Sequence, residues 1–297
     1  ISTYSGCMSA ALGPEKGNSM YNQALEKGGL AVVTGGASGV GKVAARRFAE
    51  AGLGVVIADL PGEALEQAAE EIKAVAGDRT VLAVPTDVSD FDSVSALADA
   101  AFDAGEVAVL MNNAGISMPT GSWDKIDNWR KILAVNLYGV LNGVQAFLPR
   151  MVAANRPAVV ANTGSKQGIT TPPGNPGYNV SKAGVKVLTE ALAHDLREAD
   201  APISAHLFVP GFTYTGMIQR FVPEKPDAAW TSAQTVDYFL ERMGAGDFYI
   251  LVPDNDVTEE RDRKRVAWAV GDIIENRPAL SRWHDQYESS FERFMKS

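Results

Sequence analysis

The stretch GLAVVTGGASGVG, residues 29–41, decides how this chain folds. Its first six residues are a short apolar run, which is typical of a buried β-strand. A glycine-rich turn follows up to Gly41, and helical periodicity then continues to Ala51. The stretch therefore predicts a strand, a tight turn and a helix in direct succession, which is the opening unit of an α/β fold.

Short apolar runs and stretches of helical periodicity keep alternating as far as Gly211. Several runs are apolar on both faces, as parallel strands covered by helices must be. Alternation with short links implies right-handed crossovers, so we predict an α/β fold with a Rossmann-type, doubly wound parallel sheet. The expected strands are 29–34, 53–59, 80–88, 107–115, 158–165 and 203–211, and the expected helices after the one ending at Ala51 are 63–76, 90–104, 123–154 and 178–198.

The regular pattern breaks after Gly211. The segment 221–230 is rich in proline and predicts a loop, which a helix at about 232–243 follows. The run 247–253 then predicts a seventh strand. We expect 212–245 as a whole to form the loop region on the side where a ligand binds.

One domain is expected over 20–255, followed by a helical C-terminal extension over 256–297 that packs on the same domain. The extension is predicted to contain two charged amphipathic helices, divided near Asn276–Pro278. Residues 1–19 are small and polar, and predict a flexible leader or a remnant of expression. Aromatic side chains at helical spacing are expected to pack the extension onto the body: Trp268, Trp283, Tyr287, Phe291 and Phe294.

Composition excludes several classes of function. The chain has 27 Lys and Arg against 36 Asp and Glu, a net charge of −9, and an acidic surface disfavours nucleic acid as a partner. The single cysteine, Cys7, cannot form an internal disulfide. The sequence contains no run of about 18 apolar residues, which a membrane span would require, and no secretory signal is visible. We therefore expect a cytoplasmic protein. The three histidines lack metal-ligand spacing, and no metal is expected.

The glycine-rich turn and Asp59 together predict a dinucleotide site. Glycine lets a backbone approach a pyrophosphate closely, and a helix N-terminus favours an anion. Asp59 ends the second strand, 24 residues after Gly35, where an acidic residue that binds the adenosine ribose is expected. The structural alternatives are an ordinary tight turn and a helix cap. The Asp59 carboxylate would repel a 2′-phosphate, and no Lys or Arg lies within 35–41 or beside Asp59, so we expect NAD rather than NADP.

Tyr178 and Lys182 lie one helical turn apart at the start of a predicted helix. An unperturbed phenol has a pKa of about 10, too high for efficient acid–base catalysis at neutral pH, and a neighbouring ammonium lowers it. Such a pair is often only surface, but Ser165 lies just past the fifth strand, thirteen residues earlier. Both would therefore lie at the carboxyl edge of the sheet, where open α/β folds bind ligands.

In order and spacing these motifs resemble the short-chain dehydrogenase/reductase family of the single-domain type. The resemblance covers about residues 29–216 and rests on TGGASGVG (34–41), Asp59, Asp87-Val88, Asn112-Asn113-Ala114-Gly115, Asn136, Ser165, Tyr178 with Lys182, and Pro210-Gly211 with Thr215. It implies a seven-stranded sheet in the order 3-2-1-4-5-6-7. The chain departs from the family in Asn162-Thr163-Gly164-Ser165, where two adjacent serines are common, and in FYILVPDND (248–256), which replaces the usual end of the seventh strand.

The resemblance also implies roles for individual residues. Tyr178 would exchange a proton with the substrate oxygen, Lys182 would bind the nicotinamide ribose and lower the tyrosine pKa, and Ser165 would anchor the substrate oxygen. Asn136 would hold a proton-relay water near the lysine. The residues expected to bind the cofactor are Gly35, Ser38, Gly39, Val40, Gly41, Asp59, Leu60, Asp87, Val88, Asn113, Ala114, Gly115, Tyr178, Lys182, Pro210, Gly211, Thr213 and Thr215.

The function we predict is hydride transfer between NAD(H) and a secondary alcohol or ketone. The substrate candidates Gln167, Tyr214, Met217 and Phe221, with Met118, Trp123, Ile169 and Ile218 as further pocket walls, favour a bulky or aromatic substrate. The alternatives are imine reduction or epimerisation at the same site, and a non-catalytic dinucleotide-binding regulator. The resemblance further implies a homodimer or homotetramer formed through the helices at 123–154 and 178–198.

Overall fold

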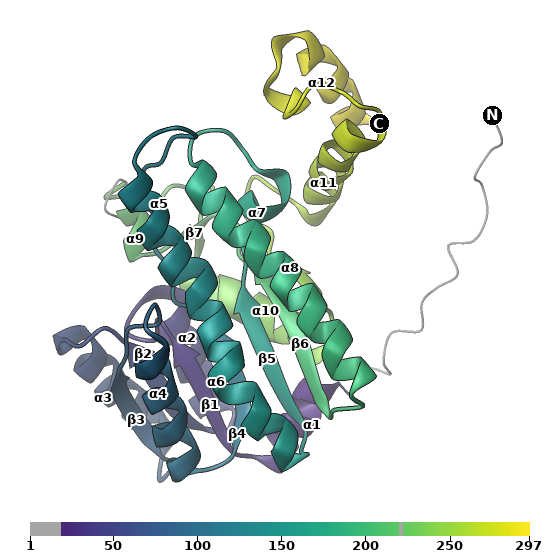
Figure 1. Cartoon of the computed structure of the whole chain (residues 1–297). Helices are drawn as coiled ribbons and strands as arrows, with labels where there is room; N and C mark the ends of the chain where they lie inside the picture. The colour runs from purple at the N-terminus through teal and green to yellow at the C-terminus, as the bar shows by residue number, and fades with distance from the viewer. Residues whose placement is uncertain (1–18, 220–221) are drawn as a thin grey trace.

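The computed structural model describes residues 19–219 and 222–297, and its centre is a seven-stranded parallel sheet in the order β3-β2-β1-β4-β5-β6-β9 (Figure 1). Its strands are β1 (Leu30–Thr34), β2 (Gly54–Asp59), β3 (Val81–Pro85), β4 (Val107–Asn112), β5 (Ala158–Thr163), β6 (Ile203–Val209) and β9 (Tyr249–Leu251). Every neighbouring pair is parallel. The predicted fold class and strand order are confirmed.

Helices cover both faces of the sheet because alternate residues of each strand point to opposite sides. On β1, Ala31 and Val33 pack into one buried cluster, and Leu30 and Val32 pack into another. The first cluster lies under α1 (Met20–Lys27), α2 (Gly39–Glu50), α3 (Glu63–Ala76) and α10 (Ser232–Gly244). The second lies under α4 (Phe91–Ala104), α6 (Gly139–Ala154) and α8 (Pro176–Glu198), the helices in front in Figure 1.

The long helix expected over 123–154 is interrupted in the structure. It consists of α5 (Ile126–Leu133), a π-helical turn η1 (Ala134–Tyr138) and α6. Such turns are rare and occur often at functional sites. Within the described residues, the stretch 126–154 is the one helix long and apolar enough to cross a membrane. Its side chains Phe147 and Met151 are buried against the sheet, which is typical of a core helix.

Other elements differ from the prediction in extent. The seventh strand, β9, has three residues instead of the expected 247–253, because the chain leaves the sheet edge at Val252. Helix α1, which Ser19 caps, was not predicted; it begins directly after the expected leader, of which residues 1–18 lie outside the described residues. The remaining short elements are α7 (Gln167–Thr170), α9 (Gly216–Gln219) and the two-stranded sheet of β7 (Thr213–Tyr214) and β8 (Trp230–Thr231).

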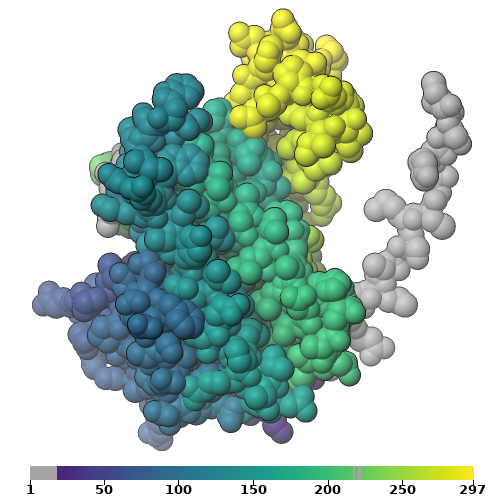
Figure 2. Space-filling view, viewed as in Figure 1, coloured from purple at the N-terminus to yellow at the C-terminus, as the bar shows by residue number. Residues whose placement is uncertain are grey.

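The C-terminal extension forms α11 (Glu259–Ile274), two 3₁₀ turns at Ser281–Trp283 and Asp285–Tyr287, and α12 (Glu288–Lys296). It projects from the body as a separate lobe in Figures 1 and 2. The Trp268 ring lies 5.3 Å from the rings of both Phe291 and Phe294, and the Arg277 guanidinium stacks on it at 4.0 Å. The expectation that these aromatic rings pack the extension onto the body is therefore wrong, because they pack the extension onto itself.

Candidate active site

The glycine-rich turn brings the start of α2 directly against the end of β1. Gly35 has a φ of +67°, which favours glycine. A Cβ at Gly41 would lie 2.1 Å from the Gly35 carbonyl oxygen and 2.6 Å from Asn113 Nδ2. Glycine at 41 therefore allows the helix to begin in contact with the turn, so that its free N–H groups face the carboxyl edge of the sheet.

Asp59 lies beside this turn, as the sequence predicts. Its Oδ2 accepts a hydrogen bond from the Ala37 N–H at 3.0 Å, and its Oδ1 accepts one from the Leu60 N–H at 2.9 Å. No ion pair involves Asp59 in the part of the chain that the structure describes. The carboxylate therefore fixes the glycine-rich turn while it keeps its negative charge uncompensated by a neighbouring cation.

Polar side chains join the ends of β1, β4 and β5. The Thr34 hydroxyl accepts hydrogen bonds from the backbone N–H groups of Asn113 at 2.9 Å and Ala114 at 3.2 Å. The Asn113 amide donates to the Thr34 carbonyl at 3.1 Å, and its Oδ1 accepts from the Thr163 hydroxyl at 3.4 Å. Neither Thr34 nor Thr163 was predicted as a site residue, although their position as polar residues at the ends of parallel strands is a signal for one.

Tyr178, Ser165 and Lys182 come together at this edge. The Ser165 hydroxyl is hydrogen-bonded to Tyr178 and also accepts from the Gln167 N–H at 3.2 Å. Lys182 is buried, and its ammonium donates to the Thr163 carbonyl at 2.7 Å. The ammonium lies 5.9 Å from the centre of the Tyr178 ring. The three predicted side chains therefore lie close together. Ser165 contacts Tyr178 directly, and the Lys182 ammonium lies near the Tyr178 ring.

Burial is the main influence on the pKa values of Tyr178 and Lys182. Burial raises the pKa of Tyr178, and the hydrogen bond from Ser165 partly opposes the rise. Burial also lowers the pKa of Lys182 to about 8. Burial is the larger of these two effects on the Tyr178 pKa, and the expected effect of Lys182 on it stays a prediction. Ser165 is the residue that favours the phenolate.

Asn136 lies in the π-helical turn and is fully buried. Its Oδ1 accepts from the Ile116 N–H at 2.8 Å, and its amide donates to the Ile116 carbonyl at 2.9 Å and to the Ser181 hydroxyl at 3.2 Å. A Cβ at Gly115 would lie 3.4 Å from Asn136 Oδ1 and 3.6 Å from the Lys182 ammonium. The side chain therefore holds the loop after β4 against α8, and its expected role in holding a water stays a prediction.

The start of α8 is fixed by residues that the sequence analysis missed. Asn175 caps the helix, and its Oδ1 accepts from the Tyr178 N–H at 3.4 Å and from the Thr120 hydroxyl at 2.7 Å. The Thr120 hydroxyl in turn accepts from the Gly177 N–H at 2.9 Å. The signal was present, since Asn175 followed by Pro176 is a typical helix start. These contacts fix the backbone of α8 at Tyr178.

The segment after β6 lies against both β9 and the glycine-rich turn. A Cβ at Gly211 would meet the Val252 carbonyl oxygen at 2.6 Å, and the buried Thr213 hydroxyl hydrogen-bonds Thr235 at 2.9 Å. The Thr215 side chain lies 3.5 Å from the position of a Cβ at Gly39. The segment predicted to bind the nicotinamide end of the cofactor therefore adjoins the turn predicted to bind its phosphates.

The other predicted cofactor residues lie around β2 and β3. Asp87 Oδ1 accepts from the backbone N–H of Ser89 at 2.9 Å, and the Val88 carbonyl accepts from the Asn142 amide at 2.9 Å. Val88 is buried against Gly139, and Leu60 is mostly exposed. These side chains line the end of the sheet where β2 and β3 stop.

The substrate candidates divide into three groups. The Tyr214 hydroxyl donates to the backbone carbonyls of Val222 and Pro223, so it holds its own loop. Gln167 begins α7 and is exposed, and Trp123 is 94 % exposed, too far into solvent to form the wall expected of it. Phe221 and the Met217 side chain, which were also predicted to contact the substrate, lie outside the described residues.

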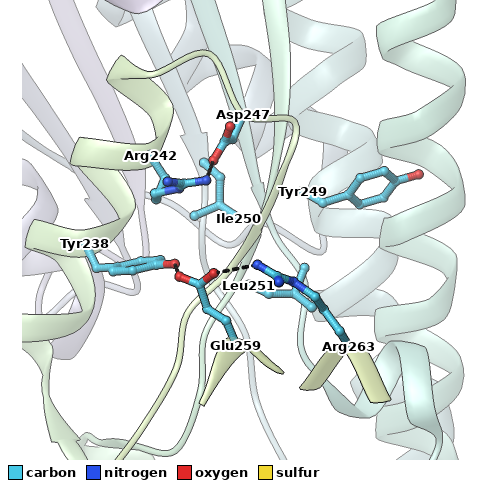
Figure 3. Close-up of a pocket in the computed structure, with 8 residues that line it drawn as sticks. All are labelled: Tyr238, Arg242, Asp247, Tyr249, Ile250, Leu251, Glu259 and Arg263. Atoms are coloured by element: carbon cyan, nitrogen blue, oxygen red, sulfur yellow. Dashed lines mark hydrogen bonds and ion pairs between the residues drawn. The ribbon is translucent and has the colours of Figure 1, made fainter. Parts of the chain in front are cut away.

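A pocket of about 190 Å³ lies elsewhere, at the β9 edge of the sheet (Figure 3). It is lined by Tyr238, Arg242, Asp247, Tyr249, Ile250, Leu251, Glu259 and Arg263. Arg242 is ion-paired with Asp247, and Glu259 pairs with Arg263 at 3.0 Å and accepts from the Tyr238 hydroxyl at 2.5 Å. Its charges are already compensated and none of the predicted site residues lines it, so we assign the chemistry to the edge at Tyr178.

Comparison with known proteins places this arrangement in a family. The profile described as "short chain dehydrogenase" matches residues 29–226. The chain is 34 % identical over 245 residues to 1-deoxy-11-beta-hydroxypentalenate dehydrogenase of Streptomyces exfoliatus, covering 80 % of this chain and 88 % of the relative. It is 34 % identical over 199 residues to 2,5-dichloro-2,5-cyclohexadiene-1,4-diol dehydrogenase of Sphingobium indicum, covering 66 % of this chain and 78 % of the relative.

A solved structure has the same fold. A short-chain dehydrogenase/reductase from Burkholderia phymatum in complex with NAD has a TM-score of 0.75 and 32 % identity, over 84 % of this chain and 95 % of that one. The fold, the edge-of-sheet site and the relatives lead to the same result. The chain belongs to the short-chain dehydrogenase/reductase family of oxidoreductases.

Proposed function

We propose that this protein interconverts a secondary alcohol and a ketone with NAD(H), and that Tyr178 is its general acid and base. The observation that carries the proposal is the convergence of three side chains at the carboxyl edge of the sheet: Ser165 interacts with Tyr178, and the buried Lys182 ammonium lies 5.9 Å from the centre of the Tyr178 ring. A phenol and a second hydroxyl at one point can hold one substrate oxygen between them.

The residues at this edge fit a nicotinamide dinucleotide. The α2 N-terminus and Gly41 leave room for a pyrophosphate to approach the backbone, and Asp59 offers carboxylate oxygens to ribose hydroxyls. The Lys182 ammonium has three protons, and one is donated to the Thr163 carbonyl. The others suit ribose hydroxyls. When bound, the cofactor supplies or accepts the hydride, and the protein supplies orientation and electrostatics.

The chain's own residues would handle the proton. In ketone reduction, Ser165 donates a hydrogen bond to the carbonyl oxygen, and Tyr178 gives that oxygen its proton as the adjacent carbon gains hydride. In alcohol oxidation Tyr178 must accept a proton, so a phenolate has to form. Ser165 is the side chain that favours the phenolate within the described structure, and Lys182 keeps a positive charge below it up to pH values near its pKa of about 8.

The substrate we propose is a bulky cyclic secondary alcohol or its ketone. Two relatives are named for the oxidation of a hydroxypentalenate and of a chlorinated cyclohexadienediol. In this chain Ile169, which was expected as a pocket wall, packs into the buried cluster that contains Val185 and Leu207. The proposed substrate class is therefore supported by these two relatives.

The Ser165→Ala variant tests the proposal. Purified protein is assayed against cyclic and linear ketones and alcohols with both cofactors, by the absorbance of the reduced nicotinamide. We expect activity with cyclic substrates and NAD(H), and a fall in turnover of about 10²-fold in Ser165→Ala, because one hydrogen-bond donor to the reacting oxygen is lost. Absence of turnover with the whole panel, or full activity in Ser165→Ala, would contradict the proposal.

Cofactor choice is tested at Asp59. Asp59→Asn removes the negative charge and keeps one acceptor oxygen, so repulsion of a 2′-phosphate falls. We expect the ratio of kcat/KM for NADPH to that for NADH to rise by about 10- to 100-fold. Asp78→Asn, an exposed site after α3 with the same change in net charge, is the control and should leave the ratio unchanged. An equal rise in both variants would mean that Asp59 does not select the cofactor.

A further inference from the structure

Three charged side chains meet next to the catalytic serine in a cluster that the proposed chemistry does not use. Lys166 directly follows Ser165, and its ammonium lies 2.6 Å from Asp262 Oδ2 and 3.6 Å from Asp254 Oδ2. The side chains of Lys166, Asp254 and Asp262 are only 19 %, 5 % and 6 % exposed. Most other ion pairs of the described residues are far more exposed, so the charges of this cluster are screened less by water.

Each member of the cluster belongs to a different segment. Lys166 precedes α7, Asp262 lies in the first turn of α11, and Asp254 lies in the loop after β9. Asp254 Oδ2 also accepts from the Phe212 N–H at 3.1 Å. The cluster therefore joins the serine turn, the C-terminal extension and the segment after Gly211.

The charges depend on one another because they are withdrawn from water. Burial raises the pKa of Asp262, and Lys166 opposes that rise. Arg265 lies 4.0 Å from Asp262 Oδ1 and adds a second, weaker counter-charge. Removing one partner of a buried pair leaves the other uncompensated, so the three segments would shift to regain water.

A shift of this cluster would move Ser165 relative to Tyr178, because the short helix α7 connects the cluster to both. Helix α7 begins immediately after Lys166, and a Cβ at Gly168 would lie 2.4 Å from the Lys182 carbonyl carbon, so α7 packs directly on α8. Ser165 accepts from the Gln167 N–H in the same turn. A displaced Lys166 therefore moves the Ser165 hydroxyl relative to Tyr178, which α8 carries.

We propose that Lys166, Asp254 and Asp262 are positioning residues, which hold the Ser165 hydroxyl at hydrogen-bonding distance from Tyr178. The C-terminal extension, through Asp262, is then a necessary support of the active site. This inference rests on the proposed function, since it assigns the cluster an effect through Ser165. The hydrogen bond from the cluster to the segment after Gly211 is made by Asp254, so variants at Lys166 and Asp262, which leave that bond in place, should leave the affinity for NADH nearly unchanged.

The test is a double-mutant cycle between Asp262→Asn and Ser165→Ala. Asp262→Asn keeps the shape of the side chain and removes its charge. We expect kcat with a cyclic ketone to fall about 10-fold, with the Kd for NADH unchanged, because a misplacement of well under 1 Å is enough for such a loss. In the Ser165→Ala background, Asp262→Asn should lower kcat by less than about twofold, since the group it positions is already absent.

Three further variants make the cycle decisive. Glu260→Gln removes a carboxylate from the same helical turn, where the side chain is exposed and pairs with Lys264, and it should keep full kcat. Lys166→Met should lower kcat as Asp262→Asn does, while Lys166→Arg keeps the cation and should stay within about threefold of the unmodified protein. Lys166→Met also serves if Asp262→Asn does not fold.

The outcomes separate this inference from the proposed function. Equal losses of kcat in both backgrounds, accompanied by weaker NADH binding and a lower Tm, would reduce the cluster to a structural role and overturn the inference. Full activity of both Asp262→Asn and Lys166→Met would overturn it as well. Full activity of Ser165→Ala would instead reject the proposed function, whatever the cluster does.

Discussion

The Tyr178→Phe variant is expected to lose turnover by about 10²- to 10⁴-fold while it binds NADH as tightly as the unmodified protein. The change removes one oxygen atom and keeps the ring. In the proposed mechanism that oxygen exchanges a proton with the substrate, with Ser165 hydrogen-bonded to it and the Lys182 ammonium 5.9 Å from the ring centre. Steady-state turnover and titration of NADH fluorescence measure the two effects separately.

The matched control is Tyr138→Phe. Tyr138 ends the π-helical turn and is 55 % exposed, so loss of its hydroxyl should leave turnover and NADH binding unchanged. Turnover of Tyr178→Phe within a few-fold of the unmodified protein would remove Tyr178 from the mechanism. A parallel loss of NADH binding would instead show that the hydroxyl holds the cofactor site together.

Local sequence patterns were sufficient to predict the sheet and to select most residues of the candidate site. The apolar runs that became β1 and β2 are continuous; Gly41 follows the first and Asp59 ends the second, while Tyr178 lies at the start of α8, after β5. Because the carboxyl ends of parallel strands share one edge, a correct strand order places these residues together without further information.

The C-terminal extension could not be predicted in the same way. Helical spacing of Trp268 and Phe291 shows that they share a buried face, but it does not say whether the body or the other tail helix covers that face. The contact between Lys166 and Asp262 joins residues far apart in the sequence, and it depends on where α11 begins after the short β9. The π-helical turn at Asn136 likewise leaves no mark in a pattern of period 3.6.

The second large effect is expected at Gly41. A methyl group there would lie 2.1 Å from the Gly35 carbonyl oxygen and 2.6 Å from Asn113 Nδ2, distances that real contacts do not reach. Both are atoms of the turn or of its support, so the turn itself must move. We expect Gly41→Ala to weaken NADH binding by about 10²-fold or more, because backbone N–H groups then lose their position relative to the pyrophosphate.

Gly244→Ala is the control for this substitution. A Cβ at Gly244, at the end of α10, would make only ordinary contacts, at 3.5 Å with Asn22 Oδ1 and 3.8 Å with Tyr21, and its φ is not positive, so added bulk costs little there. Isothermal titration with NADH gives the affinities, and circular dichroism shows whether Gly41→Ala remains folded. Unchanged affinity in a folded Gly41→Ala protein would mean that the turn relaxes without loss. The phosphate site would then have to be sought away from α2, and Asp59, which is hydrogen-bonded to the same turn, would lose its assignment as well.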